Sequence, residues 1–558
     1  MRSLVLALSI LLPGGGDVWY ADPSPPGAIP TRHAIPSTPD EIKWRVEQLR
    51  ANGVLRVADR RIESRTLMLD VYERRGFQPL WTHPAAVEGL ARAIDAAEQH
   101  GLDPEHYHRS ALSEGPGAAP PSALWGGAGP PPGRAADLDL LRTDAFVRLS
   151  SHLRFGKVEP EGPSTGAEAS WRFGGSHAMD NLVAVVSSGR VEQALASLPP
   201  RHIVYQGLMT ALADLRAVAA TGGWDRIPDG PTMRRDSTDA RVPALRRRLG
   251  VTPPFAAEQD AGILRFDAAL EAAVTSFQHT HGLNEDGLVG AATRSALNVP
   301  VERRIDQVRV NLERARWVAH QLPDAFVAVN VAGARVYVLQ GDSVVFETRA
   351  IVGTDYTRTP LFSAPMLYVD LNPTWTVPAS VAGEVLGALR EDSTYLQVQG
   401  IRVLDASGRE VDPSEIDFSR YTDGTFPYVF RQDPGPTNAL GEIKLMFPNK
   451  HSVYLHDTPS RGLFAAEKRL FSHGCIRVQN PLGLAEVVIG DPERWNREAL
   501  RAEIDKGITQ TIPLDKPMPV YVLYWTASVD LHGELHFYPD VYGRDAAILA
   551  GLDMDDGR

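Results

Sequence analysis

A single cysteine and a histidine shortly before it are the residues of this chain whose types and spacing suggest chemistry. Cys475 lies within Ser472-His473-Gly474-Cys475-Ile476-Arg477, and His456 precedes it by 19 positions. A thiol attacks only as the thiolate, and its ordinary pKa of about 8.5 leaves a few per cent ionised at neutral pH. An imidazole beside the sulfur can accept the proton, so the pair predicts acyl transfer through a cysteine nucleophile.

The elements around these two residues can bring them together. His456 ends the extended run SVYLH and Cys475 follows a loop, so we expect the side chains to meet across a sheet edge. Gly474 lets a substrate approach the backbone, and the amides of Gly474 and Cys475 could both point at a developing oxyanion. Alone, each residue has an ordinary explanation, such as a strand-end histidine or a helix-capping Asn480. Together with the sole cysteine they favour an active site.

The composition narrows the class of protein. The chain has 558 residues, of which 43% are hydrophobic and 23% charged, and this balance and length predict three or four globular domains. A formal net charge of -12 without basic runs argues against a nucleic-acid partner. One thiol can form neither an internal disulfide nor a thiolate-rich metal site, and cysteine acyl transfer requires no metal or other cofactor.

The N-terminus has the pattern of an export signal. Residues 1–21 contain Arg2 and a short apolar run from Leu4 to Leu12, which predicts a signal peptide that is either cleaved or kept as an anchor. The run is too short for a finished transmembrane helix, and no second long apolar segment follows, so we expect no stable transmembrane span. Residues 22–38 are rich in Pro, Gly and Ser and are predicted to be flexible.

Hydrophobic periodicity divides the remaining chain into helical and strand-rich parts. Apolar residues recur at helical spacing up to about residue 320, and Asp267 is expected to cap one of the helices. The period becomes two from Phe326, which indicates strands. The predicted fold class is multi-domain α+β: a helical scaffold at 39–238 with a Pro/Gly-rich loop at 115–133, a three-helix domain at 239–300, a connecting helix at 301–324, and a mainly β catalytic domain at 325–545 with a capping insert at 379–431.

The segment around Cys475 resembles a known signature. His456, Ser472 to Arg477 and Asn480 are similar to the signature of the L,D-transpeptidase catalytic domain, also called the YkuD domain. Asp457 stands where many members have glycine, which resembles the large multi-domain Gram-negative branch. Other segments resemble the further domains of that branch. VYERRGFQPLW and LRTDAFVRLSSHLRFGKVEP resemble its scaffold domain, and FDAALEAAVTSFQHTHGLNEDGLVGAATRSAL resembles its peptidoglycan-binding type 1 domain. LNPTWTVP resembles the entry into its capping insert.

This resemblance implies a periplasmic enzyme of cell-wall biogenesis and cell shape that carbapenems acylate. Cys475 would be the nucleophile and His456 the general acid/base. The implied reaction joins a donor tetrapeptide stem to Cys475 as a thioester, releases D-Ala, and transfers the acyl group to the diamino-acid amine of an acceptor stem, which forms a 3→3 cross-link. The implied partners are peptidoglycan stem peptides and glycan.

The resemblance also suggests supporting residues. Ser472, His473 and Gly474 would support the nucleophile loop and the oxyanion. The substrate-binding candidates are Arg477, Asn480, Tyr454 and Trp375. The group that orients His456 stays open, with a backbone carbonyl as one candidate.

Several functions share the same nucleophile. Water as the acceptor would give an L,D-carboxypeptidase, a protein lysine a protein-anchoring transpeptidase, and the amide of a cross-linked dimer an endopeptidase. A different class of function is a peptidoglycan-binding scaffold whose catalytic domain is idle. A papain-type protease does not fit, because in that class the cysteine precedes the histidine.

Overall fold

The computed structural model describes residues 36–113, 131–160, 182–250, 264–320, 322–341, 343–422 and 424–555. The predicted signal peptide at 1–21 lies outside the described residues. So do most of the predicted flexible segment at 22–38 and most of the Pro/Gly-rich loop at 115–133.

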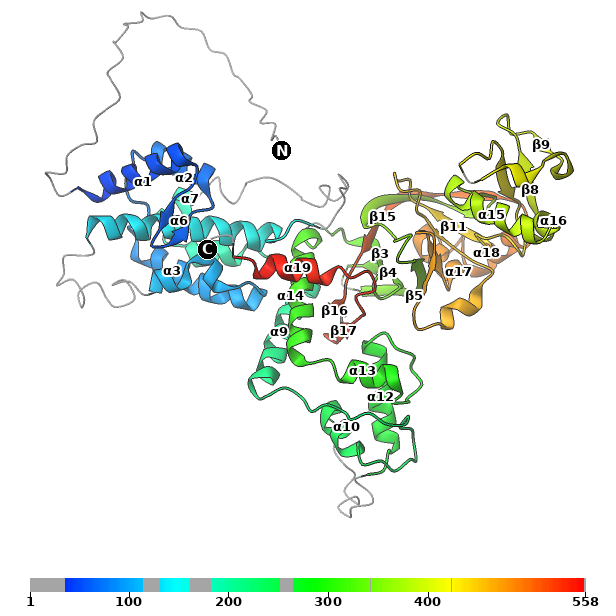
Figure 1. The fold of residues 1–558 in the computed structure, drawn as a ribbon, viewed down its shortest axis with the longest axis horizontal. Coiled ribbons are helices and arrows are strands. Elements are labelled where there is room, and N and C mark those ends of the chain that lie inside the picture. The colour runs from blue at the N-terminus through cyan, green and yellow to red at the C-terminus, as the bar shows by residue number, and fades with distance from the viewer. Residues whose placement is uncertain are drawn as a thin grey trace, which may run out of the picture.

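Helices and one short strand pair, β1 with β2, make up the N-terminal part of the structure (Figure 1). The described elements are α1 (Thr38–Asn52), β1 (Arg56–Val57), β2 (Arg60–Arg61), α2 (Arg65–Arg74), α3 (Pro84–Ala96), α4 (Arg109–Ser113), α6 (Pro132–Phe155), α7 (Leu182–Ser187), α8 (Val191–Ala196) and α9 (Ile203–Ala220). Two buried aspartates of α6 fix the preceding loops. Asp139 accepts hydrogen bonds from the amides of Leu80 and Trp81, and Asp144 accepts one from the amide of Ser64. Buried backbone donors need such partners, so α6 organises this part of the fold.

A small helical module and a long connecting helix follow. The module contains α10 (Val242–Leu249), α12 (Ala268–Thr280) and α13 (Ala291–Leu297), and α14 (Val301–Val318) leads out of it. The predicted cap is confirmed, because the Asp267 carboxylate accepts a hydrogen bond of 2.9 Å from the Leu270 amide. Gln278 in α12 donates to Asp286 at 2.8 Å and accepts from the Gly287 amide at 2.9 Å, which fixes the turn before α13.

A nine-stranded sheet forms the centre of the C-terminal part. Its order is β13-β5-β14-β12-β11-β6-β15-β3-β4, and β4 also pairs with β5, so the sheet closes on itself. Its strands are β3 (Ala325–Asn330), β4 (Arg335–Gln340), β5 (Ser343–Gly353), β6 (Phe362–Leu371), β11 (Ile443–Met446), β12 (Leu455–His456), β13 (Leu470–Ser472), β14 (Ile476–Val478) and β15 (Gln510–Leu523). The predicted fold class, a helical N-terminal part followed by a mainly β catalytic part, is confirmed.

One face of β11, β12 and β14 is apolar and packs against two helices, α17 (Pro481–Ile489) and α18 (Arg497–Ile504). The side chains on that face are fully buried and include Leu445, Leu455 and Ile476. Alternate residues of a strand point to opposite faces, so the residues between these must point away from the apolar core. The alternation therefore separates a core face from a polar face.

The chain between β6 and β11 forms an additional layer. It contains β7 (Trp375–Thr376), α15 (Ala379–Glu391), α16 (Tyr395–Gln399), β8 (Ile401–Leu404), β9 (Glu410–Val411) and β10 (Val429–Gln432), with the sheet order β7-β10-β8-β9. Leu386, Val403 and Phe430 are buried in a core of its own. Since β6 and β11 are neighbours in the main sheet, this layer is inserted without changing the order of the strands around it.

The C-terminal segment returns to the helical part. The hairpin of β16 (Ala527–Val529) and β17 (Leu535–Phe537) and the helix α19 (Asp545–Asp553) lie beside α14 (Figure 1). They share one apolar cluster with α3, α6 and α9. Among the described residues, no helix is both long and apolar enough to cross a membrane.

Buried histidines make this fold sensitive to acid. Burial and then the charge of Arg316 lower the pKa of His100 to about 4. In the unfolded chain its pKa is about 6.5, so the unfolded state binds a proton first as the pH falls. The contribution of the neutral imidazole to the free energy of unfolding is therefore fully present above about pH 6.5. Between about pH 6.5 and 4 it decreases by about 1.4 kcal/mol for each unit by which the pH falls.

We expect His100→Gln to flatten the decline of the melting temperature between about pH 6.5 and 4, since glutamine does not titrate there. Calorimetric melting temperatures across this range measure the effect. His532→Gln, at an exposed position, is the control and should keep the wild-type slope. An unchanged slope in His100→Gln would contradict the assignment.

Candidate active site

The two residues that suggested chemistry lie on neighbouring parallel strands. In the pairing of β12 with β14, His456 is opposite Arg477, and the Ile476 amide donates to the Tyr454 carbonyl at 3.1 Å. Residues opposite one another in paired strands point to the same face, and so do residues two apart in one strand. Tyr454, His456, Cys475 and Arg477 therefore share the polar face, opposite the apolar core.

The Cys475 thiol is half-buried at the start of β14. Its Sγ lies 3.7 Å from the Ser452 carbonyl, and both the backbone amide and the hydroxyl of Tyr454 hydrogen-bond to it. Burial raises the pKa of the Cys475 thiol, while the two Tyr454 contacts and the positive charges of Lys444 and Arg477 oppose this. Burial has the larger effect, so the resting sulfur is protonated at neutral pH.

The His456 imidazole is buried and held by one hydrogen bond. Its Nδ1 lies 2.5 Å from the carbonyl oxygen of Asp457. A carbonyl only accepts, so Nδ1 carries the proton and Nε2 is the basic nitrogen. Burial, then the charge of Arg477, lowers the pKa of His456 to about 3. The imidazole is therefore neutral at physiological pH, and a backbone carbonyl is the group that orients it.

The Asp457 side chain makes structural contacts of its own. Its buried carboxylate accepts a hydrogen bond from the Glu442 amide at 2.9 Å and pairs with Arg461 at 2.7 Å. Gly441 has φ +61°, and a Cβ there would lie 2.4 Å from the Asp457 carboxylate. The aspartate that departs from the usual signature is thus accommodated by a glycine on the neighbouring turn, and its side chain anchors the end of β12.

The nucleophile loop is closed by a serine. The Ser472 hydroxyl donates to the Cys475 carbonyl at 2.5 Å and accepts from the Gly474 amide at 3.1 Å. Gly474 has φ +112°, a conformation that favours glycine. Because its amide already donates to Ser472, an oxyanion role for Gly474 would require this bond to open, and that role stays a prediction. The Cys475 amide is the other donor predicted for this task.

His473 points to the inserted layer. Its Nε2 lies 2.6 Å from a carboxylate oxygen of Glu384 in α15, and both side chains are exposed. The histidine beside the nucleophile therefore joins the nucleophile loop to the layer between β6 and β11, and the structure gives it no contact with the sulfur.

The four substrate-binding candidates have different surroundings. Arg477 is half-buried, with a buried Nε that has no hydrogen-bond partner within the described part of the chain. Tyr454 contacts Trp375 of β7 through its hydroxyl, so these two join the polar face to the inserted layer. Asn480 is the N-cap of α17 and accepts from the Gly483 amide at 3.1 Å, which is the ordinary explanation of this residue.

Lys444 is a residue of the polar face that sequence reasoning missed. It lies opposite His456 in the pairing of β11 with β12, and its Nζ is 4.6 Å from the centre of the Tyr454 ring. The sequence did contain a signal for this residue: Lys444 stands between two apolar residues, Ile443 and Leu445, and both of these are buried. Lys444 and Arg477 together give this face a positive charge beside Cys475.

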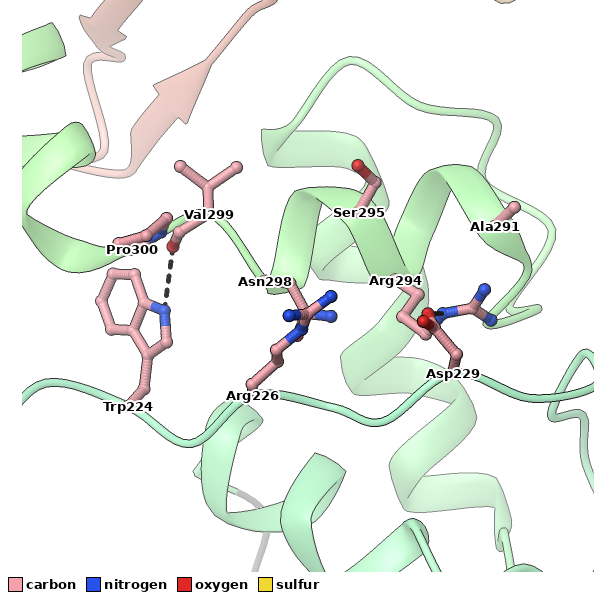
Figure 2. A pocket seen from close by; sticks show the side chains of 9 residues that line it. All are labelled: Trp224, Arg226, Asp229, Ala291, Arg294, Ser295, Asn298, Val299 and Pro300. Atoms are coloured by element: carbon pink, nitrogen blue, oxygen red, sulfur yellow. Dashed lines mark hydrogen bonds and ion pairs between the residues drawn. The ribbon is translucent and has the colours of Figure 1, made fainter.

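A concave site lies in the small helical module, away from Cys475 (Figure 2). A pocket of about 700 Å³ is lined by Trp224, Arg226, Asp229, Ala291, Arg294, Ser295, Asn298, Val299 and Pro300. Arg294 pairs with Asp229 at 3.2 Å, and the Trp224 indole donates to the Val299 carbonyl at 3.0 Å. The pocket wall therefore combines an aromatic ring with guanidinium, hydroxyl and amide groups.

One group of side chains could offer ligands to a metal within the described ranges. Ligand atoms of Asp530, Glu534 and His536 lie within 4.8 Å of one another. Asp530 accepts hydrogen bonds from the amides of His532 and Glu534 and lies 3.3 Å from His536 Nε2. These contacts close the turn between β16 and β17, so the group belongs to the hairpin and not to the polar face around Cys475.

Comparison with protein families agrees with this geometry. A Scaffold domain model matches residues 66–212, a "Putative peptidoglycan binding domain" model matches 247–297, and the L,D-transpeptidase catalytic domain model (YkuD) matches 324–494. The chain therefore carries an L,D-transpeptidase (YkuD) catalytic domain, preceded by segments that match a scaffold domain and a peptidoglycan-binding domain. The matched catalytic domain contains Cys475, His456 and the inserted layer.

A curated relative and two solved structures are also similar. A Haemophilus influenzae protein named "Putative L,D-transpeptidase" is 33% identical over 253 residues, covering 45% of this chain. The chain thus matches about half the length, 50%, of that relative. L,D-transpeptidase structures from Xylanimonas cellulosilytica and Stackebrandtia nassauensis are 15% and 12% identical, cover 53% and 52% of this chain and 99% and 97% of their own, and have TM-scores of 0.18 and 0.21.

We expect alkylation of Cys475 by iodoacetamide to rise with pH beyond the ordinary thiol range, because burial raises its pKa while His456 stays neutral. A preformed thiolate–imidazolium pair would instead react at a nearly constant rate from mildly acidic pH upward. The sole cysteine makes intact-protein mass spectrometry a direct readout.

Lys444→Gln should move this alkylation profile to still higher pH, since it removes a charge that favours the thiolate. Lys506→Gln, whose lysine pairs with Glu503 in α18, is the matched control and should leave the profile in place. A pH-independent rate in the wild type would contradict the neutral pair.

Proposed function

We propose that this chain is a peptidoglycan L,D-transpeptidase that forms 3→3 cross-links through a thioester on Cys475. The observation that carries the proposal is the pairing of β12 with β14. It puts the sole thiol and an imidazole with a basic Nε2 on one polar face. The family membership of the catalytic domain supports the reaction class.

In the first half-reaction, His456 Nε2 takes the proton from the Cys475 thiol as Sγ attacks the carbonyl carbon of the third residue of a donor tetrapeptide. The oxyanion that forms is stabilised by the Cys475 amide. Collapse of the intermediate breaks the peptide bond, and the imidazolium returns the proton to the leaving D-Ala amine. The products are a thioester on Sγ and free D-Ala.

In the second half-reaction, the diamino-acid amine of an acceptor stem attacks the thioester carbon. His456 removes a proton from that amine, and the departing thiolate recovers a proton from the imidazolium. A new peptide bond is formed and the thiol is regenerated. A neutral imidazole suits both steps, because each begins with a proton to be accepted.

Charge supports a carboxylate-bearing substrate. Lys444 and Arg477 lie on the polar face beside Cys475. The buried Nε of Arg477 has no partner among the residues that the structure describes, and a substrate oxygen could satisfy this donor. Stem peptides carry carboxylates, so we assign these two residues to substrate binding, with Tyr454 and Trp375 as the contacts with the inserted layer.

The small helical module would hold the enzyme on its polymer. Its match to a peptidoglycan-binding domain and the pocket with Trp224, Arg226 and Arg294 support binding of glycan with attached peptide. Such a substrate lies outside the cytoplasm, and we therefore propose that the enzyme works in the periplasm after export.

We expect purified protein to convert tetrapeptide-bearing muropeptides into dimers with release of D-Ala. Cys475→Ala and His456→Gln should each lower the rate by about 1,000-fold or more, as removal of a nucleophile or its base does in acyl-transfer enzymes. Chromatography of muropeptides and an assay of free D-Ala measure both products.

The same reaction separates the competing functions. Tripeptide monomers without dimers would identify water as the acceptor and replace the proposal with a carboxypeptidase. Sacculus binding without any D-Ala release would favour the scaffold. Lys506→Gln again serves as the control with wild-type turnover, and full activity in Cys475→Ala would refute the nucleophile.

A further inference from the structure

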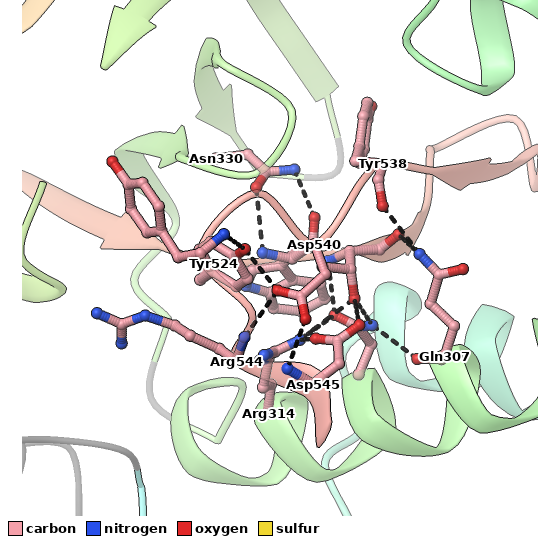
Figure 3. Close-up of polar contacts among 12 residues, drawn as sticks. Gln307, Arg314, Asn330, Tyr524, Tyr538, Asp540, Arg544 and Asp545 are labelled. Carbon is pink, nitrogen blue, oxygen red and sulfur yellow. Dashed lines mark hydrogen bonds and ion pairs between the residues drawn. The ribbon is translucent and has the colours of Figure 1, made fainter. Parts of the chain in front are cut away.

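A network of buried polar contacts joins the connecting helix α14 to the C-terminal segment of the chain (Figure 3). Arg314 pairs with Asp545 at 2.7 Å, and the other oxygen of that carboxylate accepts from the Thr526 hydroxyl at 2.7 Å. The Thr526 amide donates to Asn311 of α14 at 3.0 Å. These hydrogen bonds join the segment after β15 to α14.

The network continues through Asp540. Its carboxylate accepts from the Tyr524 hydroxyl at 2.6 Å and from the amides of Arg544 and Asp545 at 2.8 and 2.9 Å. The same Tyr524 hydroxyl accepts from the Tyr542 amide at 2.7 Å, and the rings of Tyr524 and Tyr542 are stacked with centres 5.6 Å apart. The position of the Tyr542 ring is thus set by several contacts.

The Tyr542 hydroxyl reaches the turn after β5. It donates to the Gly353 carbonyl at 2.7 Å and accepts from the Thr359 amide at 3.2 Å. Thr359 is fully buried, and its hydroxyl accepts from the Gly353 amide at 2.9 Å. This turn is tight, because a Cβ on Gly353 would lie 2.0 Å from the Thr357 carbonyl.

Thr359 in turn holds the nucleophile loop. Its hydroxyl donates to the Gly474 carbonyl at 2.9 Å. That carbonyl and the Cys475 amide belong to the same peptide unit, which is planar and trans, so the N–H points opposite to the C=O. Fixing the Gly474 carbonyl on Thr359 therefore fixes the direction of the Cys475 N–H. This amide is one of the two predicted oxyanion donors, and the other, that of Gly474, donates to Ser472.

We propose that Thr359 and Tyr542 are positioning residues that aim the Cys475 amide at the oxyanion, and that Tyr542 makes this aim depend on the docking of the C-terminal segment to α14. The inference rests on the proposed acyl transfer. The groups that shift the pKa of the Cys475 thiol are others: burial raises it, and Tyr454, Lys444 and Arg477 lower it. The network thus links the orientation of one peptide unit in the site to the junction with the helical part.

Thr359→Val removes the hydroxyl that donates to the Gly474 carbonyl and keeps the shape of the side chain. It therefore tests the first step, whether Thr359 positions the Cys475 amide. We expect the rate of D-Ala release from tetrapeptide muropeptides to fall about 100-fold at saturation, the loss typical of an oxyanion donor, with KM little changed. The pH profile of Cys475 alkylation should stay that of the wild type. Thr359→Ser keeps the hydroxyl and should restore most of the rate.

Tyr542→Phe tests the second step and should give a smaller loss, about tenfold in kcat, because Thr359 keeps its own contacts with Gly353 and Gly474. Tyr337→Phe is the control, since it removes the hydroxyl of a tyrosine in β4 that lies 3.4 Å from the Tyr538 hydroxyl, away from the Gly353 and Thr359 contacts of Tyr542. Its rate should equal that of the wild type.

Amide hydrogen exchange of the segment 471–477 gives a readout that needs no turnover. Thr359→Val and Tyr542→Phe should speed its exchange, whereas Thr359→Ser and Tyr337→Phe should not. Wild-type exchange and wild-type kcat in Thr359→Val would overturn the inference while leaving the proposed function intact. A wild-type protein that releases no D-Ala would instead refute the proposed function, and the exchange result would still decide whether Thr359 holds the loop.

Discussion

The parallel pairing of β12 with β14 is the contact on which the site depends. It sets His456 opposite Arg477 and thereby puts the imidazole and the Cys475 thiol on one face. A shift of one residue in either strand would turn one of the two side chains into the apolar core, because side chains alternate along a strand. The register is held by buried Leu455 and Ile476, so the packing of the core also fixes the geometry of the chemistry.

Burial then determines the charge state of the pair. The pKa of His456 is lowered to about 3 and that of Cys475 is raised, so both are neutral before a substrate arrives. The thiolate and the imidazolium therefore form only during the attack, when the positive charges of Lys444 and Arg477 can favour the thiolate. The loop that carries the thiol has its hydrogen bonds occupied by Ser472 and Thr359, which leaves little freedom for the peptide unit before Cys475.

Much of this was predictable from local sequence, and the remainder depended on distant contacts. The sole cysteine, the preceding histidine, the change of period near Phe326 and the Asp267 cap all have local signatures. Lys444 could be recognised only through its pairing with β12, and Thr359 and Tyr542 only through contacts that span more than 100 residues of chain. The oxyanion role expected of Gly474 stays a prediction, and spacing could not show that its amide donates to the Ser472 hydroxyl.

Intact-protein mass after exposure to a carbapenem tests the central claim most directly, because it asks at once whether the thiol is reachable, nucleophilic and open to acylation. The account predicts one adduct of the carbapenem mass on the wild type, located on the peptide that contains Cys475, and none on Cys475→Ala. A wild-type protein that stays unmodified while its thiol still reacts with iodoacetamide, or an adduct that persists in Cys475→Ala, would contradict it.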